Sequence, residues 1–346
     1  MSQDQKYPDD KLAYSGESLF YNRDKNISGF TITGLGHGGD LPINVKTDTT
    51  PTYGTRASFS ANNHSYKTDN NYYNLIPMSA NSLTASFQAK YDLNELKTQR
   101  LANFFEHHSG IKQFEFRTDT GIYKDLSGLC TNYAINHINE NHYELAANID
   151  ILESPNLFNW SGMNFVSGAS TLWKANNAYE KYDVVFTGDH SKNKLNCFFY
   201  CTGDHTSSVE GTSTAESNAP NGDKTFWSQK FFFEPDAGFQ NDVNFSLQEV
   251  NFKNSHRLRI KTHDNIAAFP LNYKFSSITT KQLKCMLHFL ENKGGYRRFE
   301  HQIPSIYNRP KVYFCPEWSH TFKYHNSHDL DVILNEDPLG IIPTGT

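Results

Sequence analysis

Two stretches decide the fold of this chain: FFEHHSGIKQFEF at residues 104–116 and FLENKGGYRRFEH at residues 289–301. Both begin with Phe-x-Glu, carry a glycine at the seventh place and reach Phe-Glu near the end, and they lie 185 positions apart. The same offset continues without a gap to the pairs Cys130/Cys315, Tyr133/Trp318, Asn141/Asn326 and Leu145/Leu330. Copies this far apart indicate two similar units and not a short-period solenoid. A chain that holds one unit twice is a candidate for pseudo-symmetric assembly.

Each copy predicts the same succession of elements. Apolar and polar residues alternate over residues 83–91 and again over 271–275, which is the period of a half-buried strand. An amphipathic helix follows, with an apolar stripe in the second copy made by Leu283, Met286, Leu287 and Leu290. Candidate helix boundaries are the N-caps Asn94 and Thr279 and the terminal glycines Gly110 and Gly295.

The remainder of each copy predicts strands. One strand is expected at residues 111–117 or 296–302, and two more form a hairpin around 139–141 or 325–327. Aromatic residues make up 14 % of the chain, which also favours β structure. The fold class is therefore predicted as mainly β with α+β character, in which one helix packs across an antiparallel sandwich or barrel. The aromatic residues Phe104, Phe114, Phe289 and Phe299 are interpreted as core.

The second copy resembles a known family. The helix, the motif Phe-Leu-Glu-x-x-Gly-Gly-Tyr-x-x-Phe that begins at Phe289, and the strand Cys315-x-x-Trp318 are similar to the minor tail proteins of long-tailed phages. The resemblance begins at Phe252 and is weaker over residues 60–155. It implies two tail-tube-like domains, each a β-sandwich or barrel with one packed helix.

The segment at residues 165–234 has a different character. Its order of Trp173, Tyr182-Asp-Val-Val, an aromatic strand, His-Thr-Ser-Ser and Trp227 is similar to small chitin-type carbohydrate-binding modules. This resemblance implies that Trp173, Tyr182, Tyr200 and Trp227 face a glycan, since flat aromatic rings can stack on a sugar face. The alternative is that these rings form the core of a small module or a protein interface.

Three parts are expected: a first tail-tube-like domain at 1–158, an inserted carbohydrate-module-like domain at 165–234, and a second tail-tube-like domain at 236–346. The first has a longer Gly/Asn/Tyr-rich segment ahead of its strand–helix core. That segment is a candidate for an arm or long hairpin that reaches a neighbour.

Chemical motifs are few. Residues 34–39 fit G-x-G-x-x-G, but no helix pattern follows, so a loop is expected. His137, Glu140 and His142 are interpreted as a solvated hairpin, Glu106-His-His108 as the polar end of a helix, and the histidines at 320, 325 and 328 as scattered edge polarity. No catalytic, metal or cofactor site is predicted, and the chain is not expected to be an enzyme.

Composition argues against a nucleic-acid-binding protein, a membrane-spanning protein and an exported protein. A net charge of −5 without a basic stripe argues against specific nucleic-acid recognition. Apolar runs are far shorter than the ~20 residues that span a bilayer, and the first residues lack the apolar region of a signal peptide. All five cysteines are expected as free thiols of a protein made in a reducing cytoplasm.

Together, the duplication and the resemblance imply a structural component of the distal phage tail. Such a tail-tip or baseplate-hub ring would join the tail tube protein to the hub or tip proteins, in a virion assembled in the host cytoplasm. A homotrimer with pseudo-six-fold symmetry is favoured and a homohexamer is the alternative, with outward modules that contact host surface polysaccharide. The competing hypotheses are a glycan-binding adhesin and a tail-associated glycan hydrolase.

Overall fold

The computed structural model describes residues 30–32, 45–47, 50–67, 73–77, 83–151, 165–186, 198–207, 225–237, 244–261, 267–303 and 310–337, apart from single positions and short runs inside these ranges. The fold is mainly β with two helices in the part of the chain described, as predicted. Residues 34–39, the G-x-G-x-x-G stretch, lie outside it. Neither helix is long and apolar enough to cross a membrane within those same ranges.

The chain forms two compact units. The first comprises Met1–Phe59, Thr84–Ser154 and His320–His325, and the second comprises Ser60–Leu83, Pro155–Ser319 and Asn326–Thr346. Residues 165–234 therefore belong to the same compact unit as most of the second repeat. The division into three domains at 1–158, 165–234 and 236–346 stays a prediction.

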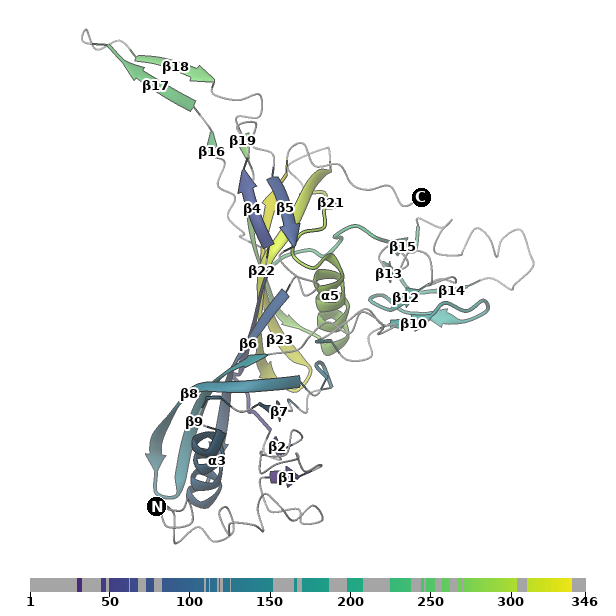
Figure 1. Cartoon of the computed structure of the whole chain (residues 1–346). Coiled ribbons are helices and arrows are strands. Elements are labelled where there is room, and N and C mark those ends of the chain that lie inside the picture. Colours follow the sequence, from purple (N-terminus) through teal and green to yellow (C-terminus); the bar gives the residue numbers. More distant parts are fainter. Residues whose placement is uncertain are drawn as a thin grey trace. The chain divides into compact units, whose positions relative to one another are not determined.

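The two repeats contain the same elements in the same order (Figure 1). The first consists of β6 (Leu83–Leu93), α3 (Glu95–His108), β7 (Phe114–Phe116), β8 (Leu126–Asn139) and β9 (His142–Ile151). The second consists of β20 (Leu271–Ile278), α5 (Thr280–Lys293), β21 (Phe299–His301), β22 (Lys311–Tyr324) and β23 (Ser327–Glu336). From the helix onward, both ends of every element differ by the offset of 185 seen in the sequence. The duplication is confirmed.

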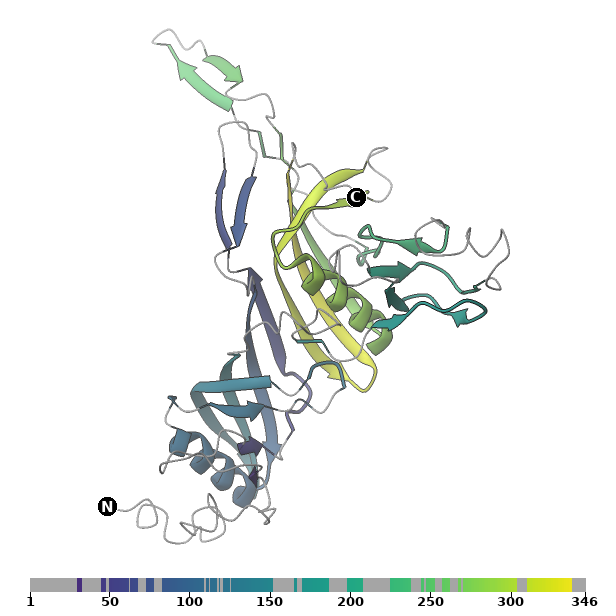
Figure 2. The ribbon, with the colours of Figure 1, turned by 45° about the vertical axis from the view of Figure 1, so that its right-hand side comes forward.

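Strand pairing is also repeated. In the first repeat β9 lies between β6 and β8 while β7 pairs with β8, and in the second repeat β23 lies between β20 and β22 while β21 pairs with β22. The register is the same after the offset, because Phe114 faces Gly128 as Phe299 faces Tyr313. In the first unit β7 also pairs with β2 (Val45–Thr47), which pairs with β1 (Phe30–Ile32). Each helix lies along its own sheet, as Figures 1 and 2 show.

The helices begin at the predicted caps. The side-chain oxygen of Asn94 accepts a hydrogen bond from the Lys97 N–H at 3.0 Å, and that of Thr279 accepts one from Gln282 at 3.2 Å. These bonds satisfy amide groups that have no partner in the first turn of a helix. At the other end of α5 the C-cap is Gly294, one residue before the predicted Gly295, and it takes a left-handed conformation with φ +59°.

The hairpin turn of each repeat supplies a second cap. Asn141 and Asn326 have positive φ values of 61° and 56°, a conformation that asparagine tolerates better than most residues. Their side-chain oxygens accept hydrogen bonds from the N–H groups of Glu95 at 3.2 Å and Thr280 at 2.8 Å. The repeated asparagine thus closes the turn and ties it to the start of the helix.

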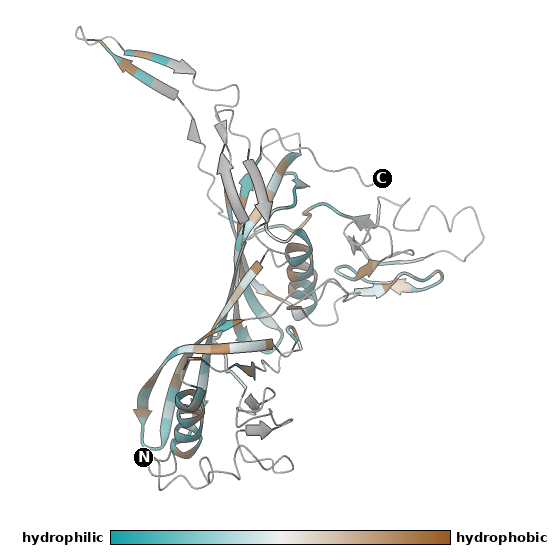
Figure 3. Ribbon diagram, viewed as in Figure 1, coloured by the Kyte–Doolittle hydropathy of each residue, from teal (hydrophilic) through white to brown (hydrophobic). Residues whose placement is uncertain are grey.

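Aromatic rings form the repeated core. The rings of Phe104 and Phe114 lie 5.2 Å apart, and those of Phe289 and Phe299 lie 5.2 Å apart with nearly the same edge-on geometry. All four side chains are buried, which confirms the predicted core. Buried and exposed residues alternate along β6, and Figure 3 shows the mixture of hydrophobic and hydrophilic residues along the strands.

The repeat extends further upstream than the sequence motifs indicate. The first repeat has β3 (Arg56–Ala61) and the hairpin of β4 (Asn63–Lys67) and β5 (Tyr73–Pro77). The second has β16 (Asn244–Phe245), the hairpin of β17 (Leu247–Asn251) and β18 (Arg257–Lys261), and β19 (Ala267–Ala268). The two hairpins have matching registers at an offset of 184. A long hairpin is therefore common to both repeats and not an extra of the first, and its contact with a neighbour stays a prediction.

The segment at residues 165–234 is all-β in its described part, as predicted. Its strands are β10 (Ser170–Leu172), β11 (Ala178–Tyr179), β12 (Val184–Phe186), β13 (Phe198–Cys201), β14 (His205–Thr206) and β15 (Trp227–Ser228). Four of them form a sheet in the order β10-β12-β13-β15, and β11 pairs with β14. We refer to this segment as the β-module.

Candidate interaction surfaces

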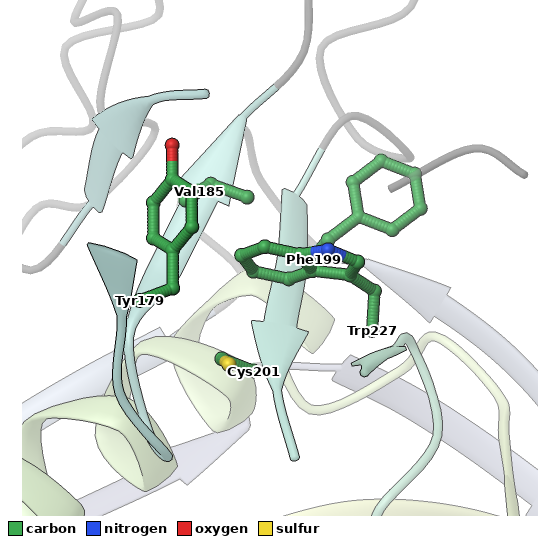
Figure 4. Close-up of a cluster of buried hydrophobic side chains, with 5 residues drawn as sticks. All are labelled: Tyr179, Val185, Phe199, Cys201 and Trp227. Carbon is green, nitrogen blue, oxygen red and sulfur yellow. The ribbon is translucent and has the colours of Figure 1, made fainter. Parts of the chain in front are cut away.

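Two of the four aromatic residues predicted to face a glycan are buried. Trp227 is 3 % exposed and belongs to a cluster with Tyr179, Val185, Phe199 and Cys201, shown in Figure 4. Tyr200 is 1 % exposed. A buried ring cannot stack on a sugar in this conformation, so both residues serve the core of the second unit.

Tyr200 packs against the helix of the second repeat. Its ring lies 5.2 Å from that of Phe289, and its hydroxyl oxygen lies 3.1 Å from Nδ1 of His288. Phe198, two residues earlier on β13, places its ring 4.7 Å from His288. The β-module thus covers the face of α5 that points away from the sheet, an arrangement visible in Figure 2.

The other two predicted aromatics are half-buried. Trp173 packs against the cluster around Trp227. Tyr182 lies elsewhere, with its ring stacked on Phe232 and Phe233 at 6.3 and 6.2 Å and with the Lys181 ammonium 5.1 Å from its centroid. The four rings therefore do not gather on one open face. Glycan binding by the β-module stays a prediction, and of the four residues only Trp173 and Tyr182 are not fully buried.

Polar contacts also fix the β-module to α5. The Glu291 carboxylate accepts hydrogen bonds from the backbone N–H groups of Phe165 at 2.9 Å and Val166 at 3.1 Å. At the other end of the helix, the Lys281 ammonium contacts Glu180 at 2.7 Å and Asp183 at 2.8 Å. The Phe-x-Glu motif near the end of both helices contains Glu291, but the hydrogen bonds of Glu291 to the β-module were not predicted from sequence.

Two buried histidines of the second unit, His288 and His301, are held neutral. Burial lowers the pKa of His288 to about 3, and burial also lowers the pKa of His301 to about 4 although its bond to the Phe231 carbonyl acts in the other direction. His301 lies 2.8 Å from the Tyr273 hydroxyl and 2.9 Å from the Phe231 carbonyl. At neutral pH both imidazoles are therefore uncharged parts of the core.

Other histidines correct the sequence analysis. His108, expected at the polar end of a helix, is fully buried, and its ring lies 4.1 Å from that of Phe104. His320 and His328, expected as scattered edge polarity, are also buried. Neighbouring elements cover them, which sequence alternation alone does not reveal. By contrast, His137 and His142 are at the exposed end of the β8–β9 hairpin, as predicted.

No metal or thiol chemistry is evident in the described ranges. These residues contain no group of three or more histidine, cysteine or acidic side chains placed to hold a metal ion. Cys130, Cys201, Cys285 and Cys315 are free and buried, which confirms the prediction for four of the five cysteines, while Cys197 lies outside the described residues. Burial raises the pKa of Cys201 to about 11, so this thiol is protonated at neutral pH.

The edges of β8 and β22 differ. The end of β22, His320–His325, belongs to the first unit, where it lies beside β3. Phe322 accepts a hydrogen bond from the Gly54 N–H at 2.7 Å and donates one to the Thr55 carbonyl at 3.0 Å. The equivalent edge of β8 pairs with β7 only as far as Gly128, and no other described strand lies beside it.

Comparisons with known proteins identify no family. No family model matches the sequence, and no curated protein matches it. Among solved structures, the chain is similar to one described as the tail protein from Neisseria meningitidis MC58, with 11 % identity, a TM-score of 0.26, and coverage of 83 % of this chain and 92 % of that one. A TM-score this low does not establish a common fold.

Proposed function

We propose that this chain is a structural protein of the distal end of a phage tail, where it forms a ring between the tail tube and the tip or baseplate hub. The observation that carries the proposal is the duplication, which preserves element bounds, strand register and helix caps at a constant offset. The place in the tail rests on the resemblance of residues 289–318 to minor tail proteins. Its partners would be the tail tube protein and the hub or tip proteins.

The duplication favours a trimer. Two equivalent repeats in each chain allow three copies to supply six repeats, which matches a six-fold tube by closed cyclic symmetry. A homohexamer would use only one repeat of each chain in the ring. The role is structural and not enzymatic, and release of reducing sugar from envelope glycans by the purified chain would contradict this part of the proposal.

Light scattering after size-exclusion chromatography, followed by imaging of the purified particles, tests the ring. We expect a particle of three chains of 39.6 kDa each, with six similar lobes around an opening. Six chains would favour the hexamer. A monomer at every concentration would contradict the ring and favour the adhesin hypothesis.

Contact between the β-module and host polysaccharide forms the finer part of the proposal. Trp173 and Tyr182 would make the contact with the polysaccharide, because Tyr200 and Trp227 are buried. A pull-down on chitin or peptidoglycan should retain the wild-type chain and lose Trp173→Ala. Equal retention of the two proteins would remove this contact and leave the structural role intact.

A further inference from the structure

We infer that Lys293 and Arg297, at the C-terminal end of α5, form a binding site for an oxyanion, either a phosphate group or a carboxylate. Both side chains are half-buried. Among the described residues, no carboxylate forms an ion pair with either of them. The site is separate from the proposed ring and from the predicted glycan contact of the β-module, so the inference does not depend on the proposed function.

The two cations stand one turn of backbone apart where the chain leaves α5. The Arg297 N–H donates a hydrogen bond to the Lys293 carbonyl at 3.0 Å. The Lys293 ammonium lies 5.2 Å from the centroid of the Phe289 ring. The Arg297 guanidinium donates hydrogen bonds to the Asn292 carbonyl at 2.6 Å and to the Tyr296 hydroxyl at 3.0 Å. These contacts hold both side chains in place, but all of the acceptors are uncharged.

The end of the helix offers no further acceptor to the Lys293 ammonium. The last four carbonyls of an α-helix have no partner inside the helix, and a lysine side chain near the C-terminus often bonds to them. In α5 the carbonyls of residues 290–293 already accept hydrogen bonds from the Gly294 N–H or from the N–H groups of Arg297. The capping role that usually explains a lysine at this place is therefore filled by other groups.

The surroundings of Lys293 disfavour its positive charge. Burial lowers the pKa of Lys293, and the neighbouring charge of Arg297 lowers it further, to about 8. A half-buried cation without a partner loses hydration that nothing replaces. The next residue along the chain, Arg298, has such a partner, since it contacts the Asp337 carboxylate at 2.5 Å. An oxyanion beside Lys293 and Arg297 would supply the negative charge that this pair lacks.

The chemistry of the two side chains suits an oxyanion. An ammonium group carries N–H donors in several directions, and a guanidinium group carries a planar fork of donors, of which Arg297 uses two in the bonds described above. Lysine and arginine are the side chains that bind phosphate and carboxylate groups by charge-assisted hydrogen bonds. At neutral pH, below the pKa of about 8, Lys293 is still mostly charged.

The first repeat lacks this arrangement. His108 stands at the place of Lys293, and its ring lies 4.1 Å from that of Phe104, the equivalent of Phe289. Nδ1 of His108 also lies 2.7 Å from the Phe104 carbonyl oxygen. The side chain at this place in the first repeat thus bonds to its own helix. The shared fold therefore does not require a lysine at position 293.

Thermal unfolding of the full chain tests the inference. The melting temperature is measured in sodium phosphate, sodium acetate and sodium chloride at equal ionic strength, for wild type, Lys293→Met and Arg297→Gln. The control is Lys284→Met, which removes another half-buried lysine of α5 whose pKa is lowered by burial alone. We expect phosphate to raise the melting temperature of wild type and of the control above the value in chloride, because a ligand that binds only the folded chain stabilises it. This rise should be lost in Lys293→Met and Arg297→Gln.

A second readout distinguishes a binding site from a structural role. In chloride, Lys293→Met should be at least as stable as wild type, because it removes the repulsion between the two cations and keeps most of the side-chain stem. A large loss of stability in chloride would mean that the lysine supports the fold, and it would overturn the inference. A rise in phosphate that is equal in all four proteins would be the general stabilising effect of phosphate, and it would also overturn the inference, as would equal melting temperatures of wild type in the three salts.

The acetate measurement separates the two sources of the oxyanion. A rise with phosphate alone would support a phosphate group as the ligand. A similar rise with acetate would support a carboxylate, which an acidic segment of a partner protein can supply. Neither result changes the oligomeric state on which the proposed function depends, so the two proposals fail independently.

Discussion

The helices α3 and α5 have the same length, equivalent N-cap hydrogen bonds and an equivalent edge-on pair of phenylalanine rings, but they have different surroundings. Every residue of α5 is at least partly buried, whereas α3 exposes Glu95, Leu96, Lys97 and Gln99. The β-module covers α5 through Phe198, Tyr200 and the backbone at Phe165. Residues shared by the two repeats therefore stabilise the common fold. Residues that differ between the repeats determine which neighbouring segment each helix contacts.

Substitution of the shared core phenylalanines should give the largest effect. Phe104→Ala and Phe289→Ala each remove a buried ring, which typically costs about 3–5 kcal/mol. Phe289 also contacts Tyr200, Phe231 and Phe233, at ring distances of 5.2, 5.7 and 6.2 Å. We therefore expect a larger loss of unfolding free energy for Phe289→Ala, measured by urea denaturation. A larger loss for Phe104→Ala would contradict the idea that the β-module adds to the core of the second repeat.

The shared features could be predicted from sequence, because they are local. The offset of 185 and the hydrophobic period revealed the strand–helix–strand order, the caps at Asn94 and Thr279, and the core rings at Phe104 and Phe289. Each depends on residues within a few turns or one hairpin.

The differing features could not be predicted in this way. Tyr200 and His288 meet across 88 positions of sequence, and Tyr123 meets His320 across 197. Whether such a ring is exposed or buried depends on tertiary packing, which a single sequence does not encode as a period. For this reason the sequence leaves open whether Tyr200 and Trp227 face a ligand or form a core, and it wrongly predicts polar surroundings for His108 and His320.

Acid should weaken the second repeat through a group that the first repeat lacks. The folded-state pKa of His288, about 3, is below the ordinary value of 6.5. The unfolded chain therefore takes up a proton as pH falls below 6.5, while the folded chain does not until about pH 3. Stability is fully present above pH 6.5, and by pH 4 we expect a loss of ~3 kcal/mol from this histidine.

His288→Asn introduces the residue that the first repeat has at the same place, Asn103. The variant should lose less unfolding free energy than wild type between pH 7 and pH 4, in urea denaturation at both values. Its stability at pH 7 is compared separately, because the substitution also alters packing against Tyr200. If wild type and variant lost the same free energy on acidification, His288 would not be the group that titrates.

The smallest contrast concerns the glutamate of the shared Phe-x-Glu motif. In the second repeat Glu291 accepts hydrogen bonds from two backbone N–H groups of the β-module, whereas Glu106 of the first repeat accepts a hydrogen bond from the side-chain hydroxyl of Tyr133 at 3.0 Å. A glutamine at 291 would turn an amide NH₂ toward one of those donors, so we expect a loss of about 1–3 kcal/mol. A glutamine at 106 can still accept through its carbonyl oxygen and should cost under about 1 kcal/mol.

Limited proteolysis gives a second measurement for the variants Glu291→Gln and Glu106→Gln. If the Glu291 carboxylate holds the start of the β-module on α5, Glu291→Gln should speed cleavage within residues 165–186, and Glu106→Gln should leave that rate unchanged. The same cleavage rate in both variants, with equally small losses of stability, would mean that the aromatic contacts of Phe198 and Tyr200 hold the β-module without this clamp. The shared glutamate would then contribute only to its own helix. The different surroundings of α3 and α5 would in that case be explained by their aromatic neighbours alone.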